Sequence, residues 1–215
     1  MTIGIIGSAE VGQALGHGFL AEGHSVMLGT RNPKKEEVLN WQKAHSAAAV
    51  GDFRETATFG EVLVLCVPGA AVEEVIALAG PENFRGKIVI DVTNPIAKGA
   101  PVNGVLKFFT TLDDSLMERT QRLLPGARLV KAFNSVGSDL MYKPKLRGGP
   151  PTMFICGNDE KARKAVTDIL TSFGWETEDM GMAEAARAIE PLCVLWCIPG
   201  FLRNQWTHAF KLLKL

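Results

Sequence analysis

Short hydrophobic segments alternate with segments of helical character along most of the chain. We predict β-strands in TIGIIG (2–7), SVMLGT (25–30), EVLVLCVP (61–68), KIVIDVTNP (87–95), ARLVKAFN (127–134) and PTMFICG (151–157). We predict helices in the intervening residues 11–21, 34–46, 70–79 and 159–173. This alternation, with nearly continuous apolar runs such as 61–68, predicts an α/β fold with a doubly wound, mainly parallel sheet.

Two parts of the chain depart from this alternation. Residues 97–114 are rich in Gly, Pro and Thr, and we predict a long loop of the kind that is often functional. Residues 182–215 are largely apolar, and we predict helix there, bent near Pro199 and Gly200. We therefore divide the chain into a main domain, 1–180, and a C-terminal helical segment, 181–215.

Composition narrows the classes of partner. The 215 residues include 23 Lys and Arg and 23 Asp and Glu, so the formal net charge is zero. We expect no nucleic-acid partner and no anionic membrane surface, because both require an excess of positive charge. No run of about 18 apolar residues predicts a membrane span, and the first residues enter a strand rather than a signal peptide. These features predict a cytoplasmic protein.

The four cysteines are scattered, and none forms a C-x-x-C pair. Cys193 and Cys197 are one helical turn apart, which is a spacing that metal ligands can use. The surrounding run is apolar and has no neighbouring histidine. We therefore favour small buried thiols and predict no metal site.

The stretch IGIIGSAEVGQAL (3–15) joins the first predicted strand to the first predicted helix. In dinucleotide-binding folds, successive glycines make the turn, let the backbone approach the pyrophosphate, and let the helix pack on the strand. Gly7 and Gly12 occupy the first and third positions, Ala9 occupies the second, and Glu10 adds a carboxylate. The helix N-terminus still offers N–H groups to an anion. We predict a dinucleotide site, and a turn without ligand is the alternative.

The second predicted strand ends in LGTRNPKK (28–35), which contains no acidic residue. An NAD site usually places Asp or Glu here to bind the ribose hydroxyls. Thr30 and Arg31, with Lys34 or Lys35 one turn further on, instead complement the 2′-phosphate of NADP(H). A solvated basic loop is the alternative, and we favour NADP(H).

Ligands of an open parallel sheet lie at the carboxyl ends of its strands. Asn94 and Asn134 follow two of these ends, and we predict ligand contacts for both, although Asn is also an ordinary turn residue. Asn158 and Asp159 instead resemble a helix cap. No catalytic acid, base or nucleophile is predicted, because the four histidines are scattered. Hydride transfer between bound cofactors depends more on positioning than on such groups.

Seven segments together resemble the coenzyme F420-dependent NADP oxidoreductase family, which includes the cytoplasmic reductase domain of the STEAP metalloreductases. They are IGIIGSAEVGQAL, LGTRNPKK, VLCVPGAAVEEV, IVIDVTNP, VKAFNS, GNDEKARKAVTDILTSFGWE and EAARAIEPL, between residues 3 and 192. The resemblance implies an NADP-binding Rossmann domain with a small C-terminal helical portion. Family members are often homodimers, with the second cofactor near the C-terminal helices.

The resemblance also implies a set of cofactor contacts. The commoner family turn has glycine or a small polar residue where Ala9 and Glu10 stand. The matching positions are Ser8, Ala9, Glu10 and Val11 at the turn, Thr30, Arg31 and Lys35 at the 2′-phosphate, and Val67, Pro68, Ala132 and Phe133 near the nicotinamide.

We therefore expect an NADP(H)-dependent oxidoreductase that transfers hydride between NADPH and a deazaflavin (F420) or a flavin. The acidic tail of F420 calls for basic residues, and those available in or near loops are Lys107, Lys143, Lys145 and Arg147. Two alternatives remain. One is an NADPH-dependent reductase of an imine or carbonyl on a small metabolite, and the other is a non-catalytic protein that senses NADPH.

Overall fold

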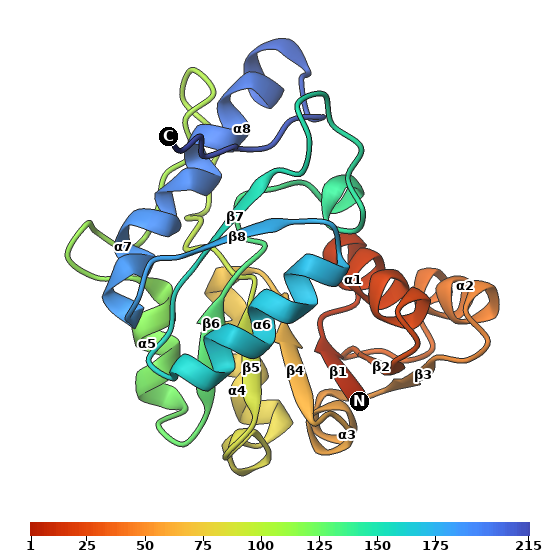
Figure 1. Ribbon diagram of the computed structural model, residues 1–215. Coiled ribbons are helices and arrows are strands. Elements are labelled where there is room, and N and C mark those ends of the chain that lie inside the picture. The colour runs from red at the N-terminus through yellow and green to blue at the C-terminus, as the bar shows by residue number, and fades with distance from the viewer.

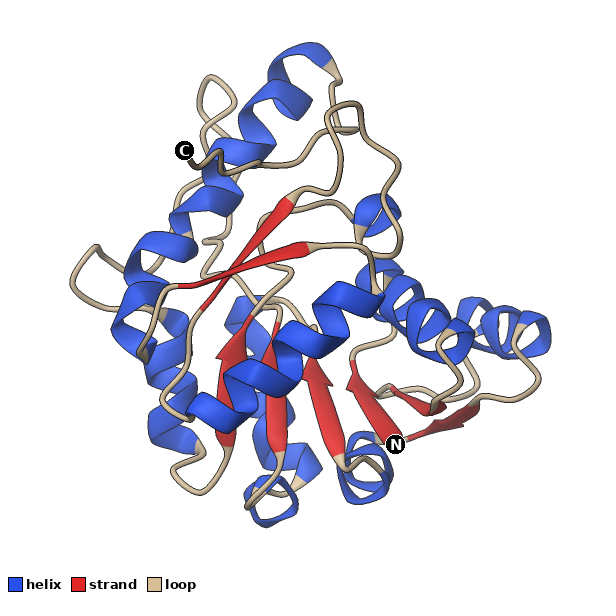
Figure 2. Cartoon of the chain, in the orientation of Figure 1, coloured by secondary structure: helices blue, strands red, loops and turns tan.

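The computed structural model describes residues 1–215 and contains a six-stranded parallel sheet (Figures 1 and 2). Its strands, in spatial order, are β3 (Ala49–Gly51), β2 (Ser25–Gly29), β1 (Thr2–Ile6), β4 (Val62–Leu65), β5 (Ile88–Asp91) and β6 (Arg128–Lys131). The chain order therefore reverses direction between β1 and β4, which pair side by side. The predicted doubly wound, parallel α/β fold is confirmed.

Each face of the sheet has its own core, because successive residues of a strand point to opposite faces. In β4, Val62 and Val64 belong to one core, whereas Leu63 and Leu65 belong to the other. The first core is covered by α1 (Glu10–Ala21), α2 (Glu36–Ala44) and α6 (Glu160–Ser172), and the second by α3 (Phe53–Phe59), α4 (Val72–Ala79) and α5 (Leu116–Leu123). Burial on both faces explains the continuous apolar runs of the strand sequences.

A second, two-stranded parallel sheet is formed by β7 (Thr152–Ile155) and β8 (Glu176–Asp179), with α6 between them in the chain. An antiparallel bridge between Lys131 and Cys156 attaches it to the carboxyl end of β6. The expected helix cap is present, because the Asp159 carboxylate accepts a hydrogen bond from the N–H of Ala162 at 2.7 Å. Figure 1 shows this smaller sheet beyond the main one, on the way to the C-terminal helices.

The long loop predicted for residues 97–114 is confirmed. Between β5 and α5 the chain forms only isolated bridges, such as Ile96 with Phe108 and Val102 with Val105. The loop therefore crosses the carboxyl edge of the sheet, where ligands of such folds bind.

The C-terminal part is helical only as far as Arg203. The elements η4 (Ala183–Ala185), α7 (Ala186–Ile189) and α8 (Pro191–Arg203) follow one another, and α8 continues through Pro199. The prediction of helix beyond this point is wrong, because Asn204 ends α8 in a left-handed conformation with φ of 52°. The chain then turns back to β7, where the N–H of Thr152 donates to the carbonyl of Phe210 at 2.8 Å.

Residues Ala183–Arg203 form one helical stretch of 21 residues that is long and apolar enough, by length and composition alone, to cross a membrane. The sequence pattern did not single it out, because Glu184, Arg187 and Glu190 interrupt the apolar run. Of its most apolar window, 39% is buried against the rest of the chain. Some of the apolar residues of this stretch are therefore part of the core of the protein.

Four short strands and α-helices were not predicted: β3, α3, α5 and β8. Two of them had a recognisable start, since α3 and α5 both begin with a capping box. Asp52 and Glu55 form the first box, and Ser115 and Glu118 form the second, with reciprocal side-chain and backbone hydrogen bonds in each. Both elements are too short for a clear apolar period.

Candidate functional site

The turn between β1 and α1 has no room for a side chain at either of its glycines. Gly7 has a φ of +133°, and a Cβ atom there would lie 2.5 Å from the carbonyl oxygen of Cys66. A Cβ atom on Gly12 would lie 2.0 Å from the carbonyl oxygen of Gly7. These contacts are the ones that a tight turn and close helix–strand packing require.

Three backbone N–H groups at the start of α1 have no acceptor within the chain, namely those of Glu10, Val11 and Gly12. Ala9 is the N-cap residue, and its methyl group offers no capping oxygen. Its φ of −80° and ψ of −174° suit any L-residue, so alanine fits without strain. The free N–H groups and the positive end of the helix dipole suit the pyrophosphate of a dinucleotide.

Glu10 does not block this N-terminus. Its side chain is exposed and lines an open groove of about 610 Å³, together with Gln13, His17, Ser138 and Asp139. A carboxylate in contact with solvent is strongly screened, so its repulsion of a bound pyrophosphate is small. Ser8 is half-buried at the turn, where its carbonyl accepts a hydrogen bond from Gln13 at 3.0 Å.

A separate cavity of about 270 Å³ lies beside the ends of β2 and β3, the half of a Rossmann fold that binds adenosine. Thr30, which is buried, and Arg31 border it as the sequence predicted. Phe53, Arg54 and Leu78 form other parts of its wall. Sequence reasoning missed Phe53 and Arg54 because α3 was not predicted, whereas Leu78 lies on α4, which was predicted but not expected to border a site.

The basic side chains near this cavity form ion pairs with acidic residues. Arg31 Nη1 lies 3.8 Å from Glu74 Oε1, and Arg54 Nη1 lies 2.9 Å from an oxygen of Glu82. Lys35 lies outside the cavity wall, where its Nζ is 3.0 Å from a Glu37 oxygen. Of the residues predicted at the 2′-phosphate, the structure therefore brings Thr30 and Arg31 together at one cavity.

The loops after β4 and β5 touch at the predicted nicotinamide positions. A Cβ atom on Gly69, directly after Val67 and Pro68, would lie 2.1 Å from the carbonyl oxygen of Asn94. The turn after β6 carries Phe133, which is buried with a φ of +61°. This φ is rare for an aromatic residue, and such strained positions cluster at functional sites.

Ala132, Phe133 and Asn134 follow β6, and Asn134 pairs with Asn94. The Asn94 side-chain amide donates to the Asn134 carbonyl at 2.8 Å, and the Asn134 amide donates to Asn94 Oδ1 at 3.2 Å. The same Asn134 amide donates to the carbonyl of Ile189 at 3.1 Å. The pair therefore ties two strand ends to α7, while Asn134 Oδ1 is buried without a partner. A ligand contact by either residue stays a prediction.

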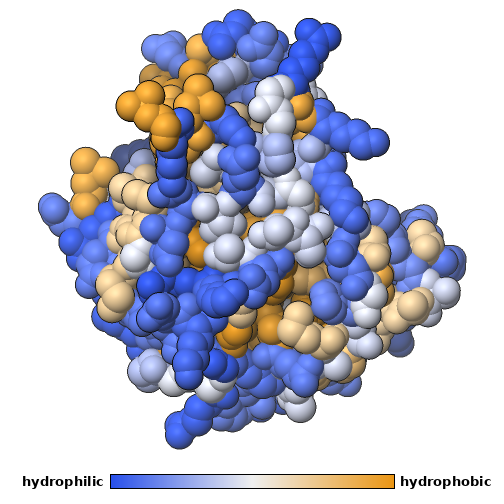
Figure 3. Space-filling model, in the orientation of Figure 1, coloured by the Kyte–Doolittle hydropathy of each residue, from blue (hydrophilic) through white to orange (hydrophobic).

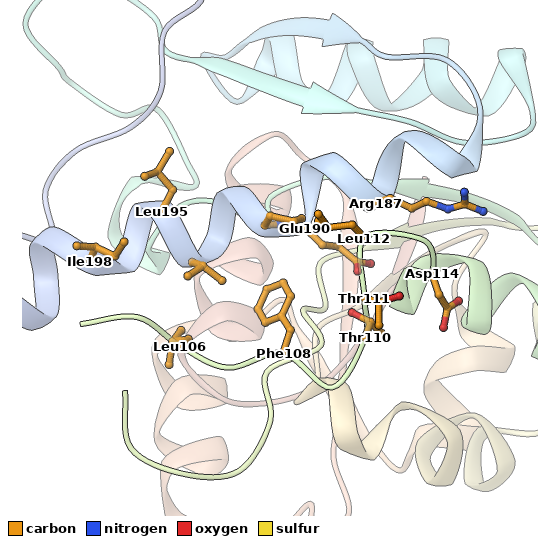
Figure 4. A pocket seen from close by; sticks show the side chains of 12 residues that line it. Leu106, Phe108, Thr110, Thr111, Leu112, Asp114, Arg187, Glu190, Leu195 and Ile198 are labelled. Carbon is orange, nitrogen blue, oxygen red and sulfur yellow. The ribbon is translucent and has the colours of Figure 1, made fainter. Parts of the chain in front are cut away.

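A second pocket, of about 420 Å³, lies between the loop 106–114 and α8. Figure 4 shows Leu106 and Phe108 on the loop facing Ile198 and neighbouring residues of α8, with Arg187 and Glu190 towards one end. The pocket is lined by Leu106, Phe108, Thr110, Thr111, Leu112, Asp114, Arg187, Glu190, Pro191, Val194, Leu195 and Ile198. Apolar walls with a few charged groups at one end are typical of a site for a flat organic ligand. Sequence reasoning placed no residue here.

The charged end of this pocket is rigidly built. Arg187 donates to both oxygens of Glu118, at 3.0 and 2.6 Å. This pairing lowers the pKa of Glu118 to about 2, against a usual value of 4.5. A further hydrogen bond from the hydroxyl of Ser115 at 2.7 Å acts in the same direction.

The cysteines behave as packing residues in the structure. Cys66 lies beneath the turn, with its Sγ 3.5 Å from the carbonyl oxygen of Ile6, and burial raises the pKa of its thiol to about 12. Cys193 is buried on α8. No group of three or more His, Cys, Asp or Glu side chains is arranged to hold a metal ion.

Known proteins with similar sequences and structures indicate the family of this chain. Residues 2–95 match the family model described as NADP oxidoreductase, coenzyme F420-dependent. A crystal structure from Arthrobacter sp. FB24, described as a candidate F420-dependent NADP reductase, is 30% identical and superposes with a TM-score of 0.93 over 100% of both chains. The chain belongs to the coenzyme F420-dependent NADP oxidoreductase family. Its activity class is therefore that of an NADP-dependent oxidoreductase.

Further comparisons show how far the similarity to known proteins extends. F420-dependent NADP reductase of Methanocaldococcus jannaschii is 27% identical, over 82% of each chain. Metalloreductase STEAP3 of Rattus norvegicus is 29% identical over 93% of this chain, which spans only 38% of the length of STEAP3. An imine reductase of Streptomyces aurantiacus shares the fold, with a TM-score of 0.66 at 16% identity, and this chain covers 63% of it. The resemblance inferred from the sequence motifs is thus confirmed.

Proposed function

We propose that this protein transfers hydride between NADPH and a deazaflavin (F420) or a flavin bound in the pocket between the loop 106–114 and α8. The proposal rests on one observation, which is that the molecule has two candidate binding sites of different chemical character. One is a turn with three free N–H groups, suited to a dinucleotide, and the other is a largely apolar pocket of about 420 Å³.

The two sites lie at the same edge of the sheet, as hydride transfer between their ligands would require. The loops that carry Pro68, Asn94 and Phe133 lie at the carboxyl ends of β4, β5 and β6. The second pocket is built by the loop that follows β5 and by α8. The hydrogen bond from Asn134 to Ile189 links the end of α7, directly before α8, to the same strand ends. Residues of both sites therefore contribute to one edge of the sheet.

Bound NADPH would supply a hydride, which carries two electrons, and the acceptor would take up that hydride together with one proton from solvent. The protein's part is to hold the two rings in contact and to exclude water, which needs no catalytic acid or base. This agrees with the apolar lining contributed by Phe108, Val194 and Ile198.

The charges near the pocket also support an anionic acceptor. Lys107 is exposed between Leu106 and Phe108, two residues of the lining, and Arg187 belongs to the lining itself. Lys143, in contrast, is paired with Glu22 at 2.7 Å. Arg187 is likewise already paired, with both oxygens of Glu118. We therefore assign the role of binding an acidic tail to Lys107, which was expected from the sequence.

We further propose that two copies associate through the region around α8, in the cytoplasm. Figure 3 shows hydrophobic side chains gathered at the end of the molecule that carries α8 and the C-terminus. The exposed apolar residues of α8 and the neighbouring loop are Val102, Val105, Leu112, Leu195, Phe201 and Leu202. Apolar surface of this kind is typical of an interface between proteins.

The deciding experiment combines calorimetry with turnover. We expect NADPH to bind in titration, and we expect its oxidation when F420, FMN, FAD or riboflavin is supplied. The variant Ile198→Trp fills the second pocket, so it should keep NADPH affinity and lose turnover about tenfold or more. Leu123→Trp is the matched control, because Leu123 lies on α5, outside the pocket and the proposed interface, and is 40% exposed.

The other outcomes identify the alternatives. Binding of NADPH without oxidation by any flavin or deazaflavin would favour the metabolite reductase or the NADPH sensor. Equal turnover of Ile198→Trp and the control would remove the pocket from the reaction. Absence of NADPH binding would contradict the proposed function as a whole.

A further inference from the structure

Three buried charged side chains, which we call the buried charge triad, meet where β5, β6 and the start of α8 come together. Lys131 Nζ lies 2.8 Å from Asp91 Oδ2 and 3.1 Å from Glu190 Oε1. The side chains of Lys131 and Asp91 are fully buried, and that of Glu190 is 2% exposed. Burial alone would lower the pKa of Lys131, but the two carboxylates outweigh it and raise that pKa. Lys131 is therefore a buried cation.

The two carboxylates outnumber the single ammonium group, and hydrogen-bond donors balance the excess. Glu190 accepts from the N–H groups of Leu116 and Met117, at 3.0 and 2.9 Å, in the first turn of α5. Asp91 Oδ1 accepts from the N–H and the hydroxyl of Thr93, at 2.9 and 2.7 Å. A helix N-terminus favours a carboxylate. Removing one member would leave the others buried and incompletely paired, which is strongly unfavourable.

The position of the triad links the two sites. Lys131 Nζ also donates to the carbonyl of Thr93 at 2.8 Å, on the strand end that leads to Asn94. Glu190 is one of the residues that line the second pocket, and it directly precedes α8. One buried cation is thus in contact with a strand end of the dinucleotide site and with a wall residue of the other pocket.

We propose that Lys131 and Glu190 are positioning residues for hydride transfer, whose ion pair fixes the wall of the second pocket against the strand ends. The inference rests on the proposed function. Hydride transfer requires reacting atoms about 3–3.5 Å apart, and a displacement of about 1 Å can cost a hundredfold in rate. The wall belongs to residues 183–203 and the strand ends belong to the main sheet, so contacts between these two parts set that distance.

A purely stabilising role makes a different prediction. If the triad only stabilised the fold, the variant Glu190→Gln would lower the melting temperature, and its folded fraction would have the kcat of the wild type. A positioning role requires that folded Glu190→Gln binds NADPH within about twofold of wild type and loses about ten- to a hundredfold in kcat.

The test is therefore steady-state kinetics of the full chain with the acceptor that the wild type reduces, together with NADPH calorimetry. Glu178→Gln is the matched control, because Glu178 is ion-paired with Lys214 and only 27% exposed, on β8. Glu190→Asp is a second variant that keeps the charge and shortens its reach, and it should show the same loss of kcat with a smaller loss of stability. A kcat equal to that of the control in both variants would overturn the proposal.

Hydrogen–deuterium exchange tests the contacts of Glu190 without requiring turnover. In Glu190→Asp we expect faster amide exchange in residues 116–119 and 186–203, with no change in α1. Unchanged exchange in those two segments would overturn the inference, even if no acceptor is found. Failure of the wild type to oxidise NADPH would instead contradict the proposed function, and with it the positioning role, and the exchange result would then test only whether Glu190 holds α8 against α5 and the strand ends.

Discussion

Arg31 and Glu74 face each other beside the cavity at the ends of β2 and β3, with Nη1 and Oε1 3.8 Å apart. Their side chains are 71% and 61% exposed, so the ion pair is screened by solvent and weak. A 2′-phosphate at Arg31 would replace this carboxylate with a doubly charged partner. The acidic residue on α4 would therefore compete with the group that distinguishes NADPH from NADH.

Replacing Arg31 should affect the two nucleotides differently. We expect Arg31→Ala to weaken NADPH binding by about 1.5–3 kcal/mol, the scale of a charged hydrogen bond, and to leave NADH nearly unchanged. Calorimetric titration with both nucleotides measures the difference. Equal losses for the two would remove Arg31 from the 2′-phosphate site.

Neutralising its partner should have the opposite effect. Glu74→Gln is expected to tighten NADPH binding about two- to fivefold, since exposed ion pairs of this kind contribute up to about 1 kcal/mol. The gain should shrink at high salt. Glu73→Gln is the control, because Glu73 lies on the same helix and is also exposed. Matching gains in both variants would show only a general charge effect.

Positions 9 and 12 of the turn should differ in how strongly they respond to an exchange between alanine and glycine. Gly12→Ala places a Cβ atom 2.0 Å from the carbonyl oxygen of Gly7, so we expect loss of NADPH binding and about 1–3 kcal/mol of destabilisation. Ala9→Gly should keep the fold, cost at most about 1 kcal/mol, and change the affinity modestly. Thermal unfolding and calorimetry of both variants check this. A collapse of Ala9→Gly would mean that the turn has another role.

Acid should weaken the charged end of the second pocket. The pKa of Glu118 in the folded chain is about 2, below its usual 4.5, mainly because Arg187 hydrogen-bonds to it. A folded pKa below the unfolded one means that the pair stabilises the fold above 4.5 and loses that contribution as the pH falls towards 2. Arg187→Met should therefore lower the free energy of unfolding at neutral pH more than at about pH 3. Urea unfolding at both pH values measures this, and an equal effect at both would contradict the pairing.

Five of the six strands of the main sheet, all except β3, were predictable because their physical cause is local. A strand such as VLVL in β4 is buried on both faces, and that alone requires an uninterrupted apolar run. The positions of Gly7 and Gly12 were predictable for a similar reason, since a sharp turn and close packing restrict single residues. The short helices α3 and α5 were missed although Asp52 and Ser115 each start a capping box, because a box marks a start and not a length.

The second pocket and the triad were not predictable in the same way. Lys131 interrupts the apolar segment ARLVKAFN, and a lysine in a buried strand was itself a sign of a buried partner. The sequence around Lys131 does not identify its partners. Asp91 and Glu190 are far from Lys131 in the chain, and only the fold brings them close to it. Arg54 was missed because its helix was missed.

The two halves of the site also differ in when they are made. The turn at residues 7–12 and all six strands of the main sheet lie within residues 2–131, whereas the helical wall of the second pocket lies in residues 183–203. As the chain emerges from the ribosome, every residue of the dinucleotide half is synthesised before the first residue of that wall. The order of synthesis thus places the proposed nucleotide site first in the growing chain, and the wall of the proposed acceptor site only afterwards.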